Sequence, residues 1–255
     1  MDYTEFKRQI LKLTNVDLNA YKEAQMKRRI DAIVQRHQCK NYQQYIELII
    51  KDKSQLEEFM SYLTINVSEF FRNPMQWKVL EEQMLPKLLQ NKRSIKIWSA
   101  ACSTGDEPYS LAMLLTRFLP LDRIQIIATD IDEEVLTKAK VGTYHEKYVL
   151  GVPKDLKSKY MIQDGDKFTV KDEIKRCVQF SRHNLLSDPY PKQVDLIICR
   201  NVVIYFTDDA KEAIYEKFSR ALAPGGILFV GSTEQIITPS RYNLESHKIF
   251  FYHKK

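Results

Sequence analysis

From residue 95 onward, short apolar runs rich in β-branched residues alternate with helical stretches. The runs occupy residues 95–98, 124–128, 178–180, 194–199 and 227–230. Alternation of this kind is typical of an α/β domain built on a largely parallel sheet. Two further runs, 242–244 and 249–252, lie too close together for a crossover and predict a hairpin. One antiparallel strand is therefore expected in the sheet.

Residues 1–66 follow a different pattern, because their apolar residues recur at helical spacing and neither glycine nor proline occurs before Pro74. The pattern predicts a small all-α bundle with helices at 3–13, 18–37, 41–50 and 54–62. Residues 67–94 are expected to form a helical linker, and residues 95–255 the α/β domain. The polar segment 144–178 carries turn signals and predicts a small β insertion.

Length and composition exclude some classes of protein. The 255 residues suffice for one large domain or two modest ones. No stretch approaches the ~18 apolar residues of a membrane span, and the N-terminus lacks the apolar core of a signal peptide, so a cytoplasmic protein is expected. The scattered cysteines include no C-x-x-C pair, which favours reduced thiols over a metal site. The net charge of +6 favours an acidic partner, which leaves nucleic acid, an anionic membrane and an acidic protein face open.

Ligands of open α/β sheets bind beyond the carboxyl ends of the strands. The segments at four of these ends are Ala100–Glu107, Asp130, Asn184 and Arg200–Asn201. Asp130 stands 25 residues past Gly105, close to the offset of about 20 residues at which an acidic side chain binds ribose hydroxyls in nucleotide-binding folds. The alternative is that Asp130 caps the next helix.

The loop "ACSTGDE" (101–107) contains one glycine, Gly105, whereas a pyrophosphate needs several free backbone N–H groups and close approach, hence several glycines. Glu107 would repel a phosphate but suits an amino group or a sulfonium. A cofactor with a ribose, a positive sulfur and no phosphate satisfies both features, so we predict S-adenosylmethionine. Glu107 is also compatible with a purely structural role in the first turn of a helix that begins near Pro108.

Six motifs in order make the chain similar to the chemotaxis receptor glutamate methyltransferases. They are "SEFFR" (68–72), "WSAACSTGDEPYSLAM" (98–113), "ATDID" (128–132), "HNLL" (183–186), "CRNVVIYF" (199–206) and "LAPGGILFVGSTE" (222–234). The resemblance covers nearly the whole chain. It implies a Rossmann-like, seven-stranded S-adenosylmethionine-dependent methyltransferase sheet with an all-α bundle before it. The implied activity forms glutamate methyl esters on the cytoplasmic helices of membrane chemoreceptors in chemotaxis adaptation, with S-adenosylhomocysteine as product.

The resemblance also implies functions for individual residues. Cofactor contacts are expected from Asn66, Ser68, Arg72, Glu107, Asp130, Asn184, Leu185, Arg200 and Asn201, with Gly105 in the cofactor loop. The acceptor carboxylate is already a nucleophile at pH 7, so no general base is needed, and catalysis depends on in-line positioning and removal of water. Arg72 and Tyr205 are the candidate catalytic residues. The alternatives are an interdomain salt bridge for Arg72 and a packing role for Tyr205.

Lys22, Arg29 and Arg36 are seven residues apart and share one face of the predicted helix 18–37. A solvated charged face is the default interpretation of such a stripe. The resemblance implies that this helix binds acidic receptor helices. It also implies that segment 144–178 is a small β-subdomain, which in some members docks a peptide at the receptor's C-terminus.

Two rival functions remain open at this stage. "SDPYP" (187–191) is similar to a loop of adenine-modifying methyltransferases, but it precedes the fourth strand, and we interpret it as a turn. We therefore expect no nucleic-acid partner, and neither a metal nor an oligomer is predicted. The second rival is a module that binds the cofactor and a receptor without transferring a methyl group.

Overall fold

The N-terminal part of the computed structural model is a helical bundle, and the structure describes residues 1–90, 92 and 94–255. Its helices are α1 (Tyr3–Thr14), α2 (Glu23–Arg36), α3 (Tyr42–Lys51) and α4 (Lys53–Leu63). The side chains of Asp2, Asn41 and Asp52 accept a backbone N–H in the first turns of α1, α3 and α4, which replaces hydrogen bonds that a helix start lacks. The apolar faces of these helices meet in a separate core around Phe6 and Phe59.

The predicted helix 18–37 is wrong at its start. Leu18–Ala20 form the short 3₁₀ helix η1, Tyr21 is extended, and α2 begins only at Glu23. Tyr21 forms an antiparallel β-bridge with Phe206, which lies far away in the sequence. This long-range backbone pairing interrupts a segment whose local pattern is helical throughout, because tertiary contacts override helix propensity.

The linker region packs under the sheet as three consecutive helical pieces. They are α5 (Pro74–Val79), a π-helical stretch η2 (Leu80–Met84) and α6 (Leu85–Leu89). Trp77, Leu80 and Leu85 are buried in the same core as the apolar side chains of the first strand.

The large sheet has the order β6-β2-β1-β7-β8-β10-β9 within the described residues. Its strands are β1 (Ile95–Ala100), β2 (Ile124–Asp130), β6 (Val178–Arg182), β7 (Val194–Cys199), β8 (Leu222–Val230), β9 (Leu244–Lys248) and β10 (Phe251–Lys254). Strand β10 runs antiparallel to both of its neighbours, whereas the pairs from β6 to β8 are parallel. The predicted methyltransferase-type sheet with an antiparallel C-terminal strand is confirmed.

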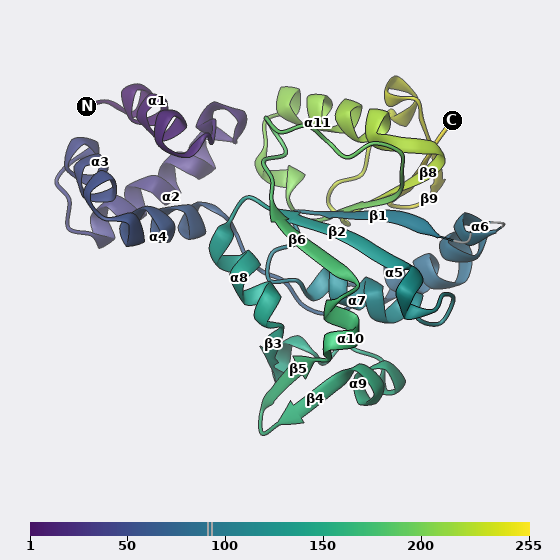
Figure 1. Ribbon diagram of the computed structural model, residues 1–255. Helices are drawn as coiled ribbons and strands as arrows, with labels where there is room; N and C mark the ends of the chain where they lie inside the picture. The colour runs from purple at the N-terminus through teal and green to yellow at the C-terminus, as the bar shows by residue number, and fades with distance from the viewer. Residues whose placement is uncertain (91, 93) are drawn as a thin grey trace.

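Helices cover both faces of this sheet (Figure 1). On one face α7 (Asp106–Leu115) and α8 (Glu133–Val141) pack with α5 in one core, and on the other α11 (Asp208–Ala221) forms a second core with β7 and β8. The short 3₁₀ turns η3 (Leu121–Arg123), η5 (Val203–Tyr205) and η6 (Pro239–Tyr242) connect elements of the sheet domain. No helix of the described residues is long and apolar enough to cross a membrane.

The predicted β insertion is also confirmed. Strands β3 (Thr143–His145), β5 (Lys167–Val170) and β4 (Met161–Asp164) form an antiparallel sheet in that spatial order. The turn η4 (Glu146–Tyr148) and the helices α9 (Lys154–Tyr160) and α10 (Asp172–Lys175) complete the insertion. It lies below the large sheet in Figure 1, away from the helical bundle.

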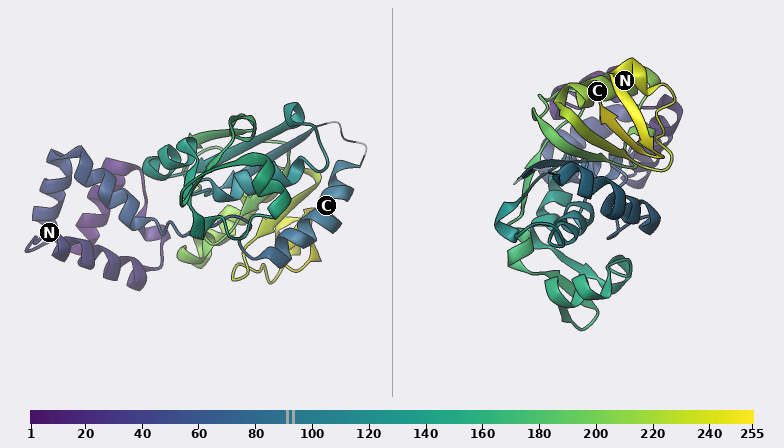
Figure 2. Two further views of the ribbon diagram at one scale, coloured as in Figure 1. Left: turned by 90° about the horizontal axis from the view of Figure 1, so that it is seen from below. Right: turned by 90° about the vertical axis from the view of Figure 1, so that its right-hand side faces the viewer.

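The helical bundle sits at the carboxyl ends of the parallel strands rather than over a face of the sheet (Figure 2). Polar contacts hold it there. Asp132 Oδ2 accepts hydrogen bonds from Thr64 Oγ1 and Asn66 Nδ2 at 3.0 and 2.9 Å. Asn184 Nδ2 donates to the carbonyl oxygen of Asn15 at 2.8 Å. The bundle and the strand ends therefore enclose a common space.

Asp132 links the two parts and also begins α8, since its Oδ1 accepts the backbone N–H of Glu134. We expect Asp132→Ala to lower the free energy of unfolding by about 2–4 kcal/mol, because it removes a helix cap and leaves polar groups without partners. Asp52→Ala is the matched control, since Asp52 caps α4 but forms no bond to the sheet domain, and should cost about 1 kcal/mol. Equal losses in denaturant titrations would show that the contact between the two parts contributes nothing.

Candidate functional site

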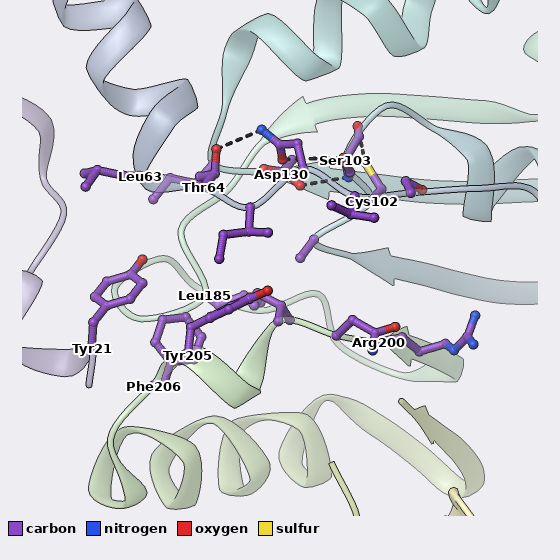
Figure 3. A pocket seen from close by; sticks show the side chains of 18 of the residues that line it. Tyr21, Leu63, Thr64, Cys102, Ser103, Asp130, Leu185, Arg200, Tyr205 and Phe206 are labelled. Carbon is purple, nitrogen blue, oxygen red and sulfur yellow. Dashed lines mark hydrogen bonds between the residues drawn. The ribbon is translucent and has the colours of Figure 1, made fainter. Parts of the chain in front are cut away.

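A cavity lies between the carboxyl ends of β1, β2, β6 and β7 and the bundle helices α2 and α4 (Figure 3). Most residues predicted for the site line this cavity: Lys22, Arg29, Asn66, Ser68, Arg72, Glu107, Asp130, Asn184, Leu185, Arg200, Asn201 and Tyr205. The fold therefore brings together side chains from six separate stretches of sequence. Gly105 and Arg36 are predicted for the site but do not line it.

The loop after β1 uses its backbone N–H groups internally. Cys102 N–H donates to the carbonyl oxygen of Thr129, and Gly105 N–H donates to that of Cys102. Ser103 N–H donates to Asp130 Oδ2 at 2.8 Å. Such a loop offers few donors to a phosphate, and the carboxylate beside it would repel one. The geometry thus suits a cofactor with a ribose and no phosphate, which is the fit that S-adenosylmethionine requires.

Gly105 has a structural role in this loop. Its φ of +90° is unfavourable for other residues, and a Cβ atom there would lie 2.9 Å from Ala139 Cβ in α8. Gly105 therefore allows the loop to turn and pack closely against α8. Gly105 does not line the cavity, and its contact with the cofactor stays a prediction.

Asp130 is 7% exposed at the end of β2, and its Oδ1 accepts the backbone N–H of Asp132 at 3.1 Å. Burial raises the pKa of Asp130 to about 6, against the opposing effect of these backbone N–H donors. The helix-capping alternative for Asp130 is wrong, because Asp132 caps α8. Asp130 is free to accept further hydrogen bonds from a ligand, since each carboxylate oxygen has two lone pairs.

Arg200 and Glu107 form a buried pair next to the loop. Arg200 Nη1 lies 3.6 Å from Glu107 Oε2, and Ser99 Oγ donates to Glu107 Oε1 at 2.8 Å. Arg200 Nη2 also donates to the carbonyl oxygen of Arg72 and to Gln76 Oε1. Burial raises the pKa of Glu107, while the positive charge of Arg200 opposes this rise. Arg200 therefore holds the segment before α5 against the end of β7 and compensates the charge of Glu107.

Arg72 and Tyr205 lie at the cavity, as predicted for the transfer site. Arg72 Nη1 donates to the carbonyl oxygen of Val67 at 3.0 Å, and Arg72 forms no ion pair with a described residue. The interdomain salt bridge expected as its alternative is therefore not present among those residues. Burial raises the pKa of Tyr205, whereas the positive charges of Arg29 and Arg72 lower it. The positive charges of two guanidinium groups are thus close enough to the Tyr205 hydroxyl to affect its pKa. Figure 3 shows this hydroxyl pointing into the cavity.

The three basic side chains of the predicted stripe, Lys22, Arg29 and Arg36, do not form one continuous solvent-exposed surface. Lys22 precedes the helix and is exposed at the cavity. Arg29 lies over the ring of Tyr62 at 4.9 Å from its centre, and Arg29 Nη2 donates to the carbonyl oxygen of Tyr62. Arg36 is exposed beside Glu58, with 3.6 Å between Arg36 Nη1 and Glu58 Oε1. Only Lys22 and Arg29 reach the cavity.

The side-chain amides of two predicted cofactor residues are occupied by protein contacts. Asn184 is 2% exposed, and its Oδ1 accepts the backbone N–H of Leu186 while its Nδ2 donates to Asn15. Asn66 Nδ2 donates to Asp132 and Thr64. These two residues position the cavity wall, and they line the cavity together with Ser68, Leu185 and Asn201.

Glu234 is a site residue that sequence reasoning missed. It is 4% exposed, and its two carboxylate oxygens accept the backbone N–H groups of Asn201, Val202, Val203 and Gly231 at 2.6 to 2.9 Å. The carboxylate thereby holds the loop that connects β7 to η5, and η5 contains Tyr205. The motif ending in "GSTE" contains this residue, but no local pattern indicates that it bonds a loop more than thirty residues earlier.

Glu234→Gln should loosen this loop, because the amide nitrogen cannot accept the N–H groups that one carboxylate oxygen now accepts. We expect the free energy of unfolding to fall by about 2–4 kcal/mol and amide hydrogen exchange to accelerate at 201–203. The exposed Glu245→Gln is the matched control and should change neither quantity. Unchanged exchange at 201–203 in Glu234→Gln would contradict this role.

The chain is similar to known proteins over nearly its whole length. Residues 66–250 match the family "CheR methyltransferase, SAM binding domain", and residues 1–64 match "CheR methyltransferase, all-alpha domain". The chain is 41% identical over 254 residues to the "Chemotaxis protein methyltransferase" of Listeria innocua, covering 99% of this chain and 97% of that protein. The protein of that name from Borreliella burgdorferi is 35% identical over 235 residues, covering 87% and 83%.

These matches span both the helical bundle and the sheet domain. The cofactor is S-adenosylmethionine and the product S-adenosylhomocysteine, because the matched sheet domain is the one that binds this cofactor. The chemistry is methyl transfer in chemotaxis. The chain belongs to the CheR methyltransferase family.

Proposed function

We propose that the protein is a protein-glutamate O-methyltransferase that forms methyl esters on the cytoplasmic helices of chemoreceptors. The observation that supports this proposal is the division of charge in the cavity. On the side of the strand ends the cavity is lined by the carboxylates of Asp130 and Glu107, with Arg200 paired to Glu107. The wall from the bundle and the segment after it carries the cations Lys22, Arg29 and Arg72 and one carboxylate, Glu69. A cationic cofactor suits the first side and an anionic acceptor the second.

On the cofactor side, Asp130 is the residue for the ribose hydroxyls, because its oxygens retain acceptor capacity at the end of β2. Leu185 adds an apolar wall, and Glu107, paired with Arg200, lines the same side of the cavity. The bound cofactor supplies a methyl group on a positively charged sulfur. Ser68 and Asn201 line the same space and are further proposed contacts.

On the acceptor side, Arg72 and Tyr205 orient the glutamate carboxylate. The Tyr205 hydroxyl stays protonated near neutral pH, because burial raises its pKa, and it can therefore donate to a carboxylate oxygen. Met60 and Leu63 form an apolar part of the cavity wall and exclude water from the reacting groups. The carboxylate is already ionised, so positioning and desolvation suffice and the chain need supply no base.

Receptor binding is assigned to the bundle side of the cavity. Lys22 is exposed at the cavity, Arg29 lies beside Tyr62, and Arg36 is exposed farther along α2, outside the cavity. Acidic receptor helices are the proposed partners, consistent with the net charge of +6. We place the enzyme in the cytoplasm as a monomer, where receptor glutamates are accessible.

The nucleic-acid alternative gains no support from "SDPYP". Asp188 Oδ2 accepts the backbone N–H of Asn184 at 2.8 Å, which makes this segment a turn. Tyr190 packs edge-on against Trp98 with ring centres 4.9 Å apart, and its hydroxyl donates to the carbonyl oxygen of Leu185. Tyr190 is therefore half-buried against the core, with Lys217 over its ring, and does not offer a free face for stacking on a base.

The direct test is transfer of a radioactive methyl group from S-adenosylmethionine to receptor cytoplasmic fragments. We expect label in the fragments that mild alkali releases as methanol, because carboxyl methyl esters are base-labile. Asp130→Ala should reduce the incorporation strongly. A fragment whose acceptor glutamates are replaced by alanine is the matched control and should take up no label.

The other outcomes of this test are equally informative. Alkali-stable label would show methylation of another group and contradict the ester. Cofactor binding without label in any fragment would favour the non-catalytic binding module. Label in nucleic acid instead of receptor would favour the rival substrate.

Cofactor affinity should depend on the ionisation of Asp130. Because the pKa of Asp130 is about 6, lowering the pH through 6 protonates its carboxylate in the free protein. A protonated carboxyl group accepts hydrogen bonds from the ribose hydroxyls less well. We therefore expect the Kd of S-adenosylhomocysteine, measured by calorimetry, to rise as the pH falls from 7 to 5. Asp130→Asn should bind more weakly and lack this pH dependence. The same pH dependence in both proteins would assign it to another group.

A further inference from the structure

Tyr21 is the aromatic residue through which the helical bundle reaches the cofactor side of the cavity. It lies between η1 and α2 in an extended conformation with φ −102° and ψ 154°. The sequence pattern predicts a helix at this position and indicates no function for Tyr21. In the structure it lines the cavity together with Asp130 and Leu185.

The backbone of Tyr21 is held from both sides by the loop that follows η5. Lys22 N–H donates to the carbonyl oxygen of Tyr205 at 2.9 Å, and Thr207 N–H donates to that of Ala20 at 2.8 Å. These two bonds enclose the bridge between Tyr21 and Phe206. The position of Tyr21 is therefore fixed relative to the transfer site, although the two belong to different parts of the chain.

The ring of Tyr21 packs against that of Phe206, with ring centres 4.8 Å apart and planes inclined at 57°. This packing leaves the hydroxyl directed into the cavity, as Figure 3 shows. Among the described residues, no group forms a hydrogen bond with the Tyr21 hydroxyl. Burial and the negative charge of Asp130 both raise the pKa of Tyr21, so the hydroxyl keeps its proton and can donate.

We propose that the Tyr21 hydroxyl is a cofactor contact, donating a hydrogen bond to the adenosine part of S-adenosylmethionine. The adenosine is the appropriate partner because Asp130, the proposed ribose acceptor, lies close enough for its charge to act on the Tyr21 hydroxyl, and the apolar Leu185 lines the same cavity. The inference rests on the proposed role of Asp130 but not on the identity of the methyl acceptor.

A consequence is that cofactor binding and the docking of the helical bundle are coupled. Tyr21 leads directly into α2, so a cofactor bound to its hydroxyl stabilises the contact between the start of α2 and the loop carrying Tyr205. By thermodynamic linkage, any interaction that stabilises α2 in this position also strengthens cofactor binding. The bundle thus completes the cofactor site as well as facing the receptor.

The test is Tyr21→Phe, which removes the hydroxyl and keeps the ring on Phe206. We expect the Kd of S-adenosylhomocysteine, measured by calorimetry without any acceptor, to rise about 3- to 10-fold, as loss of one hydrogen bond does. The melting temperature of the protein without cofactor should stay unchanged. Tyr148→Phe, on an exposed tyrosine outside the cavity, is the matched control and should leave the Kd unchanged.

A second measurement in the native protein is amide exchange at Lys22 and Thr207, which S-adenosylhomocysteine should slow and should slow less in Tyr21→Phe. An unchanged Kd in Tyr21→Phe would overturn the proposal. An unchanged Kd with a raised KM for receptor fragments would place the hydroxyl on the acceptor instead, and would overturn it equally. Because binding of the product analogue needs no acceptor, failure of the glutamate ester proposal leaves this result interpretable.

Discussion

Two buried carboxylates at the end of β2 hold the site together. Asp130 accepts the N–H of Ser103 from the loop after β1, and Asp132 begins α8 while binding Thr64 and Asn66 from the end of the bundle. Buried carboxylates are costly unless hydrogen-bonded, so their bonds strongly favour this arrangement of three segments. The cavity exists because these segments meet at one strand end.

The division of charge in the cavity follows from the way the fold combines its two parts. Strand ends of a parallel sheet converge on one edge, and here they contribute Glu107 and Asp130. The opposite wall comes from the bundle and the segment after it, which contribute Lys22, Arg29 and Arg72.

Many polar residues near the cavity act on the protein rather than on a ligand. Arg200 holds the segment before α5, Asn184 binds the bundle through Asn15, and Glu234 binds the loop before η5. These contacts order the loops before any ligand binds, which lowers the entropic cost of positioning reactants. A residue that matches a family motif can thus contribute to a site by supporting the residues that line it.

The sequence by itself determined the type and order of most elements, the antiparallel last strand, the β insertion and the strand-end positions of Glu107 and Asp130. These features depend on local periodicity and on short motifs, which contiguous residues encode. Only the tertiary structure decided that Tyr21 leaves the helix, that Gly105 packs on α8 rather than lining the cavity, and that Glu234 supports the loop of Tyr205. Each of these outcomes depends on a partner distant in sequence, and the fold alone brings such partners within hydrogen-bonding or packing distance.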